Sequence, residues 1–377
     1  MVSVTICSPS SAIGEQWRDL VRRAPSNVFM DPAALTAASV TDFAKIYLLL
    51  AWDESQTPGK LVGLWALRVR NIAPFWPAVL EALPYDYAFL STPVIDPGFV
   101  DDVICAFFAA IEKNPELPGV INLQSLNAES PAMHAMLKAL QAHGKYLKLS
   151  DHERPFATRD FGVKRSGSTR KKLRQDWNRL SAPGTADVLN DRAPGAVKDA
   201  FETFLALEAA SWKGTRGTAL LCDSNDAAFV RRLVGDLAEQ GKASVALLRL
   251  DGRVIAAQVL MYCGSTAYTW KTAFDAEYAR YSPGALLIDR ITDELFAGTE
   301  IDAIDSCAAE ESFMGQLWAG RRKMVDLLID VGSGRSPVFA MEASRLLGYR
   351  RLREMRNRLR AAASTAQPKK MPIAVAT

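Results

Sequence analysis

The order of apolar segments between residues 244 and 306 constrains the fold of this chain more than any other feature. Three strand-length segments follow one another at 244–250, 254–263 and 267–274, and Asp251-Gly252 between the first two is a typical hairpin turn. An apolar helical pattern at 285–296 and a strand-like segment at 301–306 come next. This order predicts an α/β fold in which helices pack on a mixed sheet.

The first half of the chain has a similar order of segments. The pattern predicts helices at 13–23, 100–113 and 131–143 and strands at 44–52, 61–69 and 120–123. Residues 53–60, with Pro58-Gly59, are typical of a hairpin loop. We interpret the chain as a tandem duplication with boundaries at 1–155 and 156–335.

Residues 336–377 form a third segment, predicted to be a basic amphipathic helix at about 339–363 followed by a disordered tail. Leu352, Met355 and Leu359 lie on one side of that helix. Such a helix either lies on the preceding domain or contacts an anionic membrane surface or a phosphorylated partner.

Composition excludes several classes of protein. The chain has 377 residues, of which 49% are hydrophobic and 23% charged, as in soluble globular proteins, and its net charge of +3 does not by itself indicate nucleic-acid binding. No apolar run reaches the length of a membrane helix, and the N-terminus does not resemble a secretory signal. The five cysteines are dispersed along the chain, which does not favour a disulfide framework. The three histidines all lie before residue 153, and they do not favour a metal site. We therefore expect a cytoplasmic protein without a metal. Peripheral contact with the inner face of the membrane stays an open alternative.

The junction before the helix at 285–296 has the chemistry of an anion site. Ser282 suits the N-cap, where its hydroxyl accepts from a backbone N–H, and Pro283 suits the first turn. Gly284 leaves the backbone uncovered. Free amides and the positive end of the helix dipole favour the phosphates of a cofactor, although an ordinary capped helix has the same pattern.

Several motifs occur in an order that is similar to one protein family. They are Glu208-x-x-x-Trp212-Lys213-Gly214, Gly217-Thr218-Ala219, Trp270-Lys271-Thr272-Ala273, Tyr281-Ser282-Pro283-Gly284, Asp305-Ser306-Cys307-Ala308 and Leu317-Trp318-x-x-Arg321-Arg322. Together they resemble the CelD-like branch of the GNAT acyltransferase superfamily, densely from residue 201 to 329 and weakly at 89–96. Glu310-Glu311-Ser312 stands where the family has a histidine, and the glycine-rich pyrophosphate loop of most GNAT enzymes is absent from the sequence.

The resemblance implies two tandem GNAT-like domains, the first of them degenerate. It also implies an N-acyltransferase that moves an acyl group from acyl-CoA, or an acyl-carrier protein, to an amine in a sugar, a lipid base or a small molecule. The family is associated with envelope polysaccharide and lipid synthesis, including long-chain amides. The cofactor would then bind at Tyr281, Ser282, Pro283, Gly284 and Ala285.

Acyl transfer to an amine needs a proton acceptor, for which Glu208, Asp275 and Asp305 are the candidate carboxylates. Glu208 is the first choice as catalytic base, and its alternative is a carboxylate paired with Lys213. Asp305 ends an apolar strand, where ligands of α/β sheets usually bind. Lys271 is the third catalytic candidate, as a contact to phosphate or to a carbonyl oxygen.

Another group of residues is predicted to bind substrate: Trp212, Asp275, Cys307, Trp318, Arg321 and Arg322. The two arginines would hold an anion, or are a solvated pair. Cys307 lacks a histidine partner because no histidine lies in the second half, so direct transfer is favoured over an acyl-enzyme.

Two other functions stay open. The basic segment 165–179 would bind RNA phosphates if the protein were a FemAB-like aminoacyl-tRNA-dependent transferase, a class that also pairs GNAT-like domains. The missing glycine-rich loop would fit a noncatalytic GNAT-like binding module, whereas Glu208, Lys271 and Asp305 favour an enzyme.

Overall fold

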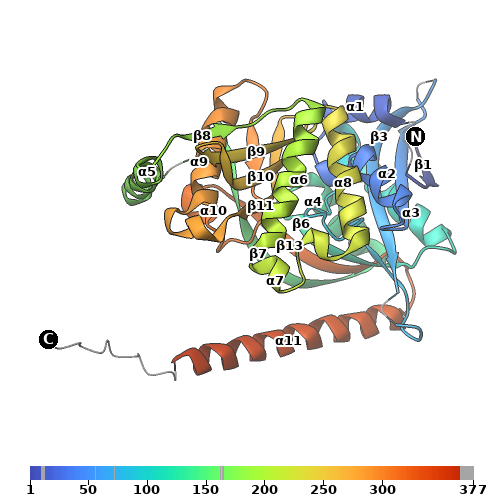
Figure 1. The fold of residues 1–377 in the computed structure, drawn as a ribbon. Helices are drawn as coiled ribbons and strands as arrows, with labels where there is room; N and C mark the ends of the chain where they lie inside the picture. Colours follow the sequence, from blue (N-terminus) through green and yellow to red (C-terminus); the bar gives the residue numbers. More distant parts are fainter. Residues whose placement is uncertain (10–12, 56, 72, 162, 164, 366–377) are drawn as a thin grey trace.

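The computed structural model describes residues 1–365 except 10–12, 56, 72, 162 and 164 (Figure 1). The first half contains, in order, β1 (Val2–Cys7), α1 (Gly14–Val21), α2 (Pro32–Val40), β2 (Ile46–Asp53), β3 (Lys60–Arg70), β4 (Val79–Glu81), β5 (Val94–Ile95), α3 (Val100–Lys113), β6 (Val120–Asn127), α4 (Pro131–His143) and β7 (Lys145–Thr158). The helices at 100–113 and 131–143 agree with the prediction at both ends.

The second half contains α5 (Gly167–Ser181), β8 (Ala186–Leu189), α6 (Pro194–Ala210), α7 (Trp212–Thr215), α8 (Ser224–Glu239), β9 (Ala243–Leu250), β10 (Arg253–Cys263), β11 (Thr266–Phe274), α9 (Pro283–Ala297), β12 (Ala303–Asp305), α10 (Met314–Leu317) and β13 (Arg321–Asp330). Apart from α5 and the short β5 and α7, its order of strands and helices is that of the first half. The two halves therefore share one order of elements, while the duplication itself stays a prediction.

The described strands form one sheet in the order β1-β2-β3-β4-β6-β13-β7-β12-β11-β10-β9-β8, and β5 pairs with β3 beside this path. The predicted α/β fold with a mixed sheet is thus confirmed. Its two parallel pairs are β4 with β6 and β11 with β12, which occupy equivalent places in the two halves. The turn between β9 and β10 holds Asp251 at φ 49° and Gly252 at φ 81°, as expected for a hairpin with two left-handed residues.

Strands β7 and β13 join the two halves. Residues 145–155 of β7 pair with β13, and residues 156–158 pair with β12. The predicted domain boundary at 155/156 therefore falls inside β7, where its partner changes. Strand β13, from the second half, lies between β6 and β7 in the first half of the sheet. The division into domains stays a prediction, because the sheet is continuous across it.

Helices cover both faces of the second half of the sheet. Val259 and Met261 of β10 pack with side chains of α6 and α8, whereas Leu260 and Tyr262 pack with those of α9. Since alternate residues of a strand point to opposite faces, α6 and α8 lie on one face and α9 on the other (Figure 1). Helix α8 also contacts α2 of the first half.

Helix α11 (Pro337–Thr365) follows the sheet and lies at the lower edge of the molecule in Figure 1. Its first turns pack on β13, while the predicted tail lies outside the described residues except for Thr365. Among the described helices, none is both long enough and apolar enough to cross a membrane.

Candidate active site

Strand β11 brings the two halves of the chain together. Its pairing with β12 ends at Tyr268 and Asp305, although β11 continues to Phe274, so the two strands separate beyond that point. On its other side Lys271 pairs with Val259 and Thr269 with Leu260, which leaves Trp270 as a bulge. Bulges redirect side chains and are frequent next to active sites. The Trp270 indole accordingly reaches the first half, where its Nε1 donates to the backbone oxygen of Tyr87 at 3.0 Å.

Lys271 lies beside this bulge in an aromatic setting. Its Nζ is 4.5 Å from the ring centroid of Tyr87 and 5.5 Å from that of Trp270. Burial lowers the pKa of Lys271 to about 8, because the carboxylate of Glu208 only partly offsets the loss of solvent and the cation of Lys213 lowers the pKa further. An amine with a pKa near neutrality can accept and release a proton during a reaction.

Glu208 is buried at the end of α6, close enough to influence Lys271. Its Oε1 accepts from Lys213 Nζ at 2.7 Å, and its Oε2 accepts from the backbone N–H of Leu220 at 3.0 Å. Both oxygens are therefore engaged by the chain. The predicted alternative for Glu208, pairing with Lys213, is present in the structure.

Tyr87 and Asp226 complete this cluster, and the sequence analysis did not identify either. The Tyr87 hydroxyl donates to a carboxylate oxygen of Asp226 at the start of α8. Burial raises the pKa of Tyr87, and the hydrogen bond to Asp226 raises it further. Tyr87 belongs to the loop after β4, in the first half, so the cluster is made by both halves. We call Lys271, Glu208, Lys213, Tyr87 and Asp226 the lysine cluster.

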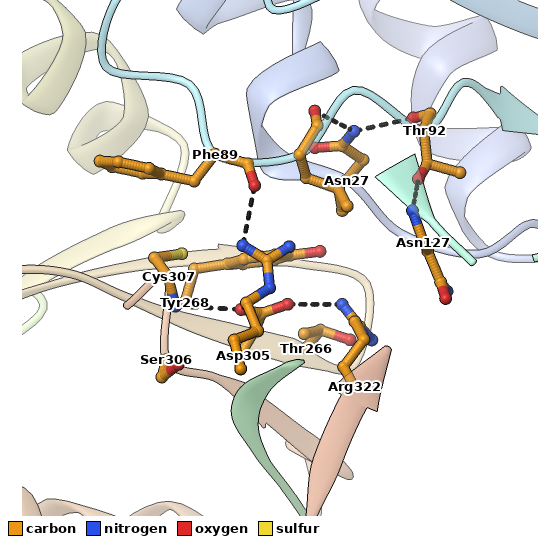
Figure 2. A network of polar contacts seen from close by, with 12 residues as sticks. Asn27, Phe89, Thr92, Asn127, Thr266, Tyr268, Asp305, Ser306, Cys307 and Arg322 are labelled. Atoms are coloured by element: carbon orange, nitrogen blue, oxygen red, sulfur yellow. Dashed lines mark hydrogen bonds and ion pairs between the residues drawn. The ribbon is translucent and has the colours of Figure 1, made fainter. Parts of the chain in front are cut away.

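Asp305 forms a second cluster at the end of β12 (Figure 2). Its carboxylate lies 3.2 Å from Arg154 Nε and 2.5 Å from Arg322 Nη1, and it also accepts from the backbone N–H of Cys307 at 3.0 Å. Arg154 Nη1 donates to the backbone oxygen of Phe89 at 2.7 Å. Asp305 is fully buried, which favours a role in holding the two arginines over direct proton abstraction.

Cys307 adopts a left-handed backbone conformation, with φ 51°. Burial raises the pKa of its thiol, and the neighbouring Asp305 carboxylate raises it further. A thiol in this state is a poor nucleophile. The environment thus agrees with the expectation of direct transfer.

The start of α9 differs in one respect from the prediction. Ser282 is the N-cap, but its φ of 54° turns the side chain away and it makes no capping hydrogen bond, so the predicted capping by the hydroxyl is wrong. Instead the hydroxyl accepts from Lys172 Nζ of α5 at 3.1 Å. Pro283 and Gly284 are buried in the first turn, followed by Ala285. A cation therefore lies at the predicted anion site, where it also pairs with the buried carboxylate of Asp176.

Gly284 is close to three side chains: a Cβ there would lie 3.4 Å from Thr272 and within 4 Å of Phe274 and Phe313. Tyr278 and Tyr281 lie in the turn before α9, with their ring centroids 6.5 Å apart. The guanidinium of Arg179 lies 5.6 Å from the centroid of the Tyr281 ring. This end of α9 thus combines aromatic rings, basic side chains of α5 and a compact first turn.

The other predicted substrate contacts are dispersed. Trp212 is 58% exposed, with the Arg216 guanidinium 4.9 Å from its ring. Asp275 pairs with Arg253 at 2.7 Å and accepts from the backbone N–H of Glu277. Neither joins the lysine cluster or the Asp305 cluster.

Trp318 and Arg321 stabilise the second half. The Trp318 indole is buried in its core and donates to Thr292 Oγ1 at 3.2 Å. The Arg321 guanidinium donates to the backbone oxygens of Trp318, Gly320 and Gly315 at 2.7 to 3.0 Å. Of the two predicted anion-binding arginines, Arg322 alone takes part in the Asp305 cluster.

A pocket of about 760 Å³ opens beside the Asp305 cluster. Its wall contains Arg322 and Thr266 from the second half, and Leu90, Thr92 and Asn127 from the first. Figure 2 shows Arg322, Thr266, Thr92 and Asn127 of this wall. Asn27 Nδ2 fixes this wall by donating to the backbone oxygens of Leu90 at 3.0 Å and Thr92 at 2.8 Å. Residues of both halves therefore line the pocket, just as residues of both halves form the lysine cluster.

Comparison with known proteins agrees with this geometry. Residues 167–313 match a family model described as an acetyltransferase (GNAT) domain, so this part of the chain is similar to GNAT-type acetyltransferase domains. No curated protein matches the chain in sequence. The predicted CelD-like branch and the acyl-CoA donor are not decided by the match and stay predictions.

Solved structures show the same fold over most of the chain. FemX is 10% identical with a TM-score of 0.59, over 86% of this chain and 96% of its own. The C-terminal domain of a putative lysylphosphatidylglycerol synthetase from Agrobacterium fabrum is 16% identical with a TM-score of 0.54, over 88% and 96%. L-PGS from Bacillus licheniformis is 14% identical with a TM-score of 0.52, over 90% and 98%.

Proposed function

We propose that this protein is an N-acyltransferase that transfers an acyl group from acyl-CoA, or an acyl-carrier protein, to an amine acceptor in envelope polysaccharide or lipid synthesis. The observation that carries the proposal is Lys271, a lysine whose pKa is about 8, placed at the bulge of β11 in a GNAT-type domain. A surface lysine would stay almost entirely protonated at neutral pH, whereas about one tenth of a lysine with a pKa near 8 is neutral at pH 7.

In this proposal Lys271 is the proton acceptor. The acceptor amine attacks the thioester carbonyl, the C–N bond forms, the C–S bond breaks, and the amine proton passes to Lys271 Nζ. The Lys271 ammonium can then protonate the departing thiolate, which restores the neutral amine. Glu208 acts through Lys271, because its carboxylate and Lys213 together set the electrostatic potential at that nitrogen. Asp305 pairs with Arg154 and holds Arg322 at the pocket wall.

The donor is assigned to the start of α9, from Tyr281 to Ala285. The dipole of a 15-residue helix and the Lys172 ammonium beside Ser282 both favour the phosphates of CoA. Acyl-CoA should therefore bind to the unmodified protein and stabilise it. At a concentration about 100 times its dissociation constant, a ligand adds about 2.7 kcal/mol to the free energy of unfolding.

One observation favours a second candidate, the aminoacyl-tRNA-dependent transferase. Helix α5 exposes Arg170, Lys171, Arg174 and Arg179, and a row of basic side chains suits RNA phosphates. In this alternative α5 binds RNA as a whole, whereas in the first proposal Lys172 acts through its position at Ser282.

A matched pair of substitutions on α5 separates the two candidates. Lys172→Gln removes the cation at Ser282, and Lys171→Gln removes an exposed cation from the same helix. We expect long-chain acyl-CoA to raise the melting temperature, with binding weakened by Lys172→Gln and unchanged by Lys171→Gln. A salt-sensitive response to total tRNA, reduced equally by both changes and with no response to any CoA, would establish the second candidate. Absence of product with every donor would instead favour a noncatalytic module.

A further inference from the structure

Helix α11 consists of two parts with different surroundings. In the first, Phe339, Ala343 and Leu346 pack on a small apolar cluster around Val120 and Leu328 of the sheet. Glu342 is fully buried there; it pairs with Arg345 at 2.5 Å and accepts from Trp76 Nε1 at 3.3 Å. This part anchors the helix to the body of the molecule.

The second part leaves the body. Arg350 donates to the backbone oxygen of Leu149, and the side chains of residues 351–356 are all exposed. Tyr349, Leu352 and Met355 are 64%, 66% and 59% exposed, and they follow one another at intervals of three residues. Residues three apart are neighbours on a helix, so these three side chains form one apolar stripe. The side chain of Leu359, predicted for the same stripe, lies outside the described part of the chain.

Positive charge is concentrated around this stripe. Residues 349–358 carry five arginines and one glutamate, Glu354, a net charge of +4, whereas the entire chain carries +3. Arg353 and Arg356 are both exposed beside Leu352 and Met355. The remainder of the molecule is thus close to neutral, and the charge of this face is a local property of α11.

We propose that the outer face of α11 (Tyr349, Leu352, Met355, Arg353 and Arg356) binds the surface of an anionic phospholipid bilayer. A membrane surface uses both features of the face: the apolar stripe enters the boundary between headgroups and acyl chains, and the arginines meet lipid phosphates. RNA would use the charge but not the stripe. A second copy of the chain would bring two faces of the same charge together. The proposal is independent of the reaction proposed above.

Vesicle flotation with the full-length protein tests this inference. Vesicles of phosphatidylcholine alone are compared with vesicles that contain 30% phosphatidylglycerol, a composition that is on the order of natural anionic membranes. We expect binding to the anionic vesicles only. Leu352→Gln/Met355→Gln, which removes the stripe and keeps the charge, should weaken binding by about tenfold or more.

Arg353→Gln/Arg356→Gln keeps the stripe and should weaken binding roughly thirtyfold, since each basic residue near an anionic surface contributes about 1 kcal/mol. Lys171→Gln/Arg174→Gln on α5 is the matched control, with the same loss of charge elsewhere, and should bind as the unmodified protein does. Melting curves check that each variant is folded.

Three results would overturn the proposal. The first is the absence of vesicle binding, or equal binding to neutral and anionic vesicles. The second is salt-sensitive RNA binding that requires Arg353 and Arg356 but not Leu352 and Met355, which would assign the face to RNA. The third is self-association that is lost in Leu352→Gln/Met355→Gln, which would assign it to a second copy of the chain.

Discussion

Replacing Lys271 by methionine should stabilise the folded protein while it removes activity. The pKa of Lys271 is about 8 in the folded protein, against 10.5 for an unperturbed lysine. Below pH 8 both the folded and the unfolded chain hold the proton, so the folded state bears the full cost of a buried cation. That difference in pKa corresponds to about 3 kcal/mol at most. Methionine has a similar length and no charge, so it avoids this cost.

The sign of the effect with pH follows from proton binding. Between pH 8 and pH 10.5 the unfolded chain keeps the proton that the folded protein releases, so the unmodified protein gains stability as pH rises. The advantage of Lys271→Met should thus be greatest at pH 6 to 7 and disappear above about pH 10.5. For a chain of this length, 3 kcal/mol corresponds to a rise in melting temperature of roughly 4 °C.

Urea unfolding at pH 6, 7, 9 and 10.5 measures this dependence for Lys271→Met, Lys271→Arg and the exposed control Lys171→Met. Lys271→Arg keeps a permanent cation and should not be stabilised. The rate of acyl transfer by the unmodified enzyme should rise through about pH 8, where Lys271 becomes neutral, and neither Lys271 variant should show that rise. If Lys271→Met were no more stable than the unmodified protein at pH 7, the reasoning would be refuted, because burial of the Lys271 cation would then not reduce the free energy of unfolding.

Two further predictions concern the Asp305 cluster. Asp305→Asn leaves the buried guanidinium of Arg154 and the half-buried one of Arg322 without their carboxylate, so it should lower the free energy of unfolding by about 3 to 5 kcal/mol, as measured by urea unfolding. The control Asp302→Asn, at an exposed ion pair three residues earlier, should change that free energy by no more than about 1 kcal/mol. Equal effects of the two substitutions would contradict the assignment. Cys307→Ala should keep the rate of acyl transfer within about threefold because burial raises the pKa of the thiol, whereas a loss of a hundredfold or more would indicate a covalent acyl-enzyme.

Local signals explain which elements were predictable from the sequence. The Asp251-Gly252 turn and the apolar runs around it are signals that depend only on neighbouring residues. Three consecutive strands were therefore predicted to within one or two residues. Strands β7 and β13 were not predicted. β7 contains charged residues at several positions and Pro155, which argues against a central strand, and β13 begins with Arg321, Arg322 and Lys323. Their place in the middle of the sheet depends on pairing with each other across the chain.

The candidate site was predicted only where its residues lie in local motifs. Lys271, Glu208 and Asp305 stand in such motifs, and the structure places Lys271 and Glu208 in one cluster and Asp305 in another. Tyr87 carries no signal of this kind, because it lies in a loop without periodicity, and Asp226 at the start of α8 has the pattern of an ordinary first-turn residue. Their roles arise from a contact between residues 139 positions apart.

The same loop that supplies Tyr87 connects the first half of the chain to both clusters. The backbone oxygen of Tyr87 accepts a hydrogen bond from Trp270, the neighbour of Lys271 in the lysine cluster, and that of Phe89 accepts one from Arg154 of the Asp305 cluster. Because these two backbone oxygens are only two residues apart along the chain, the loop keeps the two clusters close together. The first half would then be retained as the wall that positions the chemistry of the second, with β7 and β13 holding the halves in register.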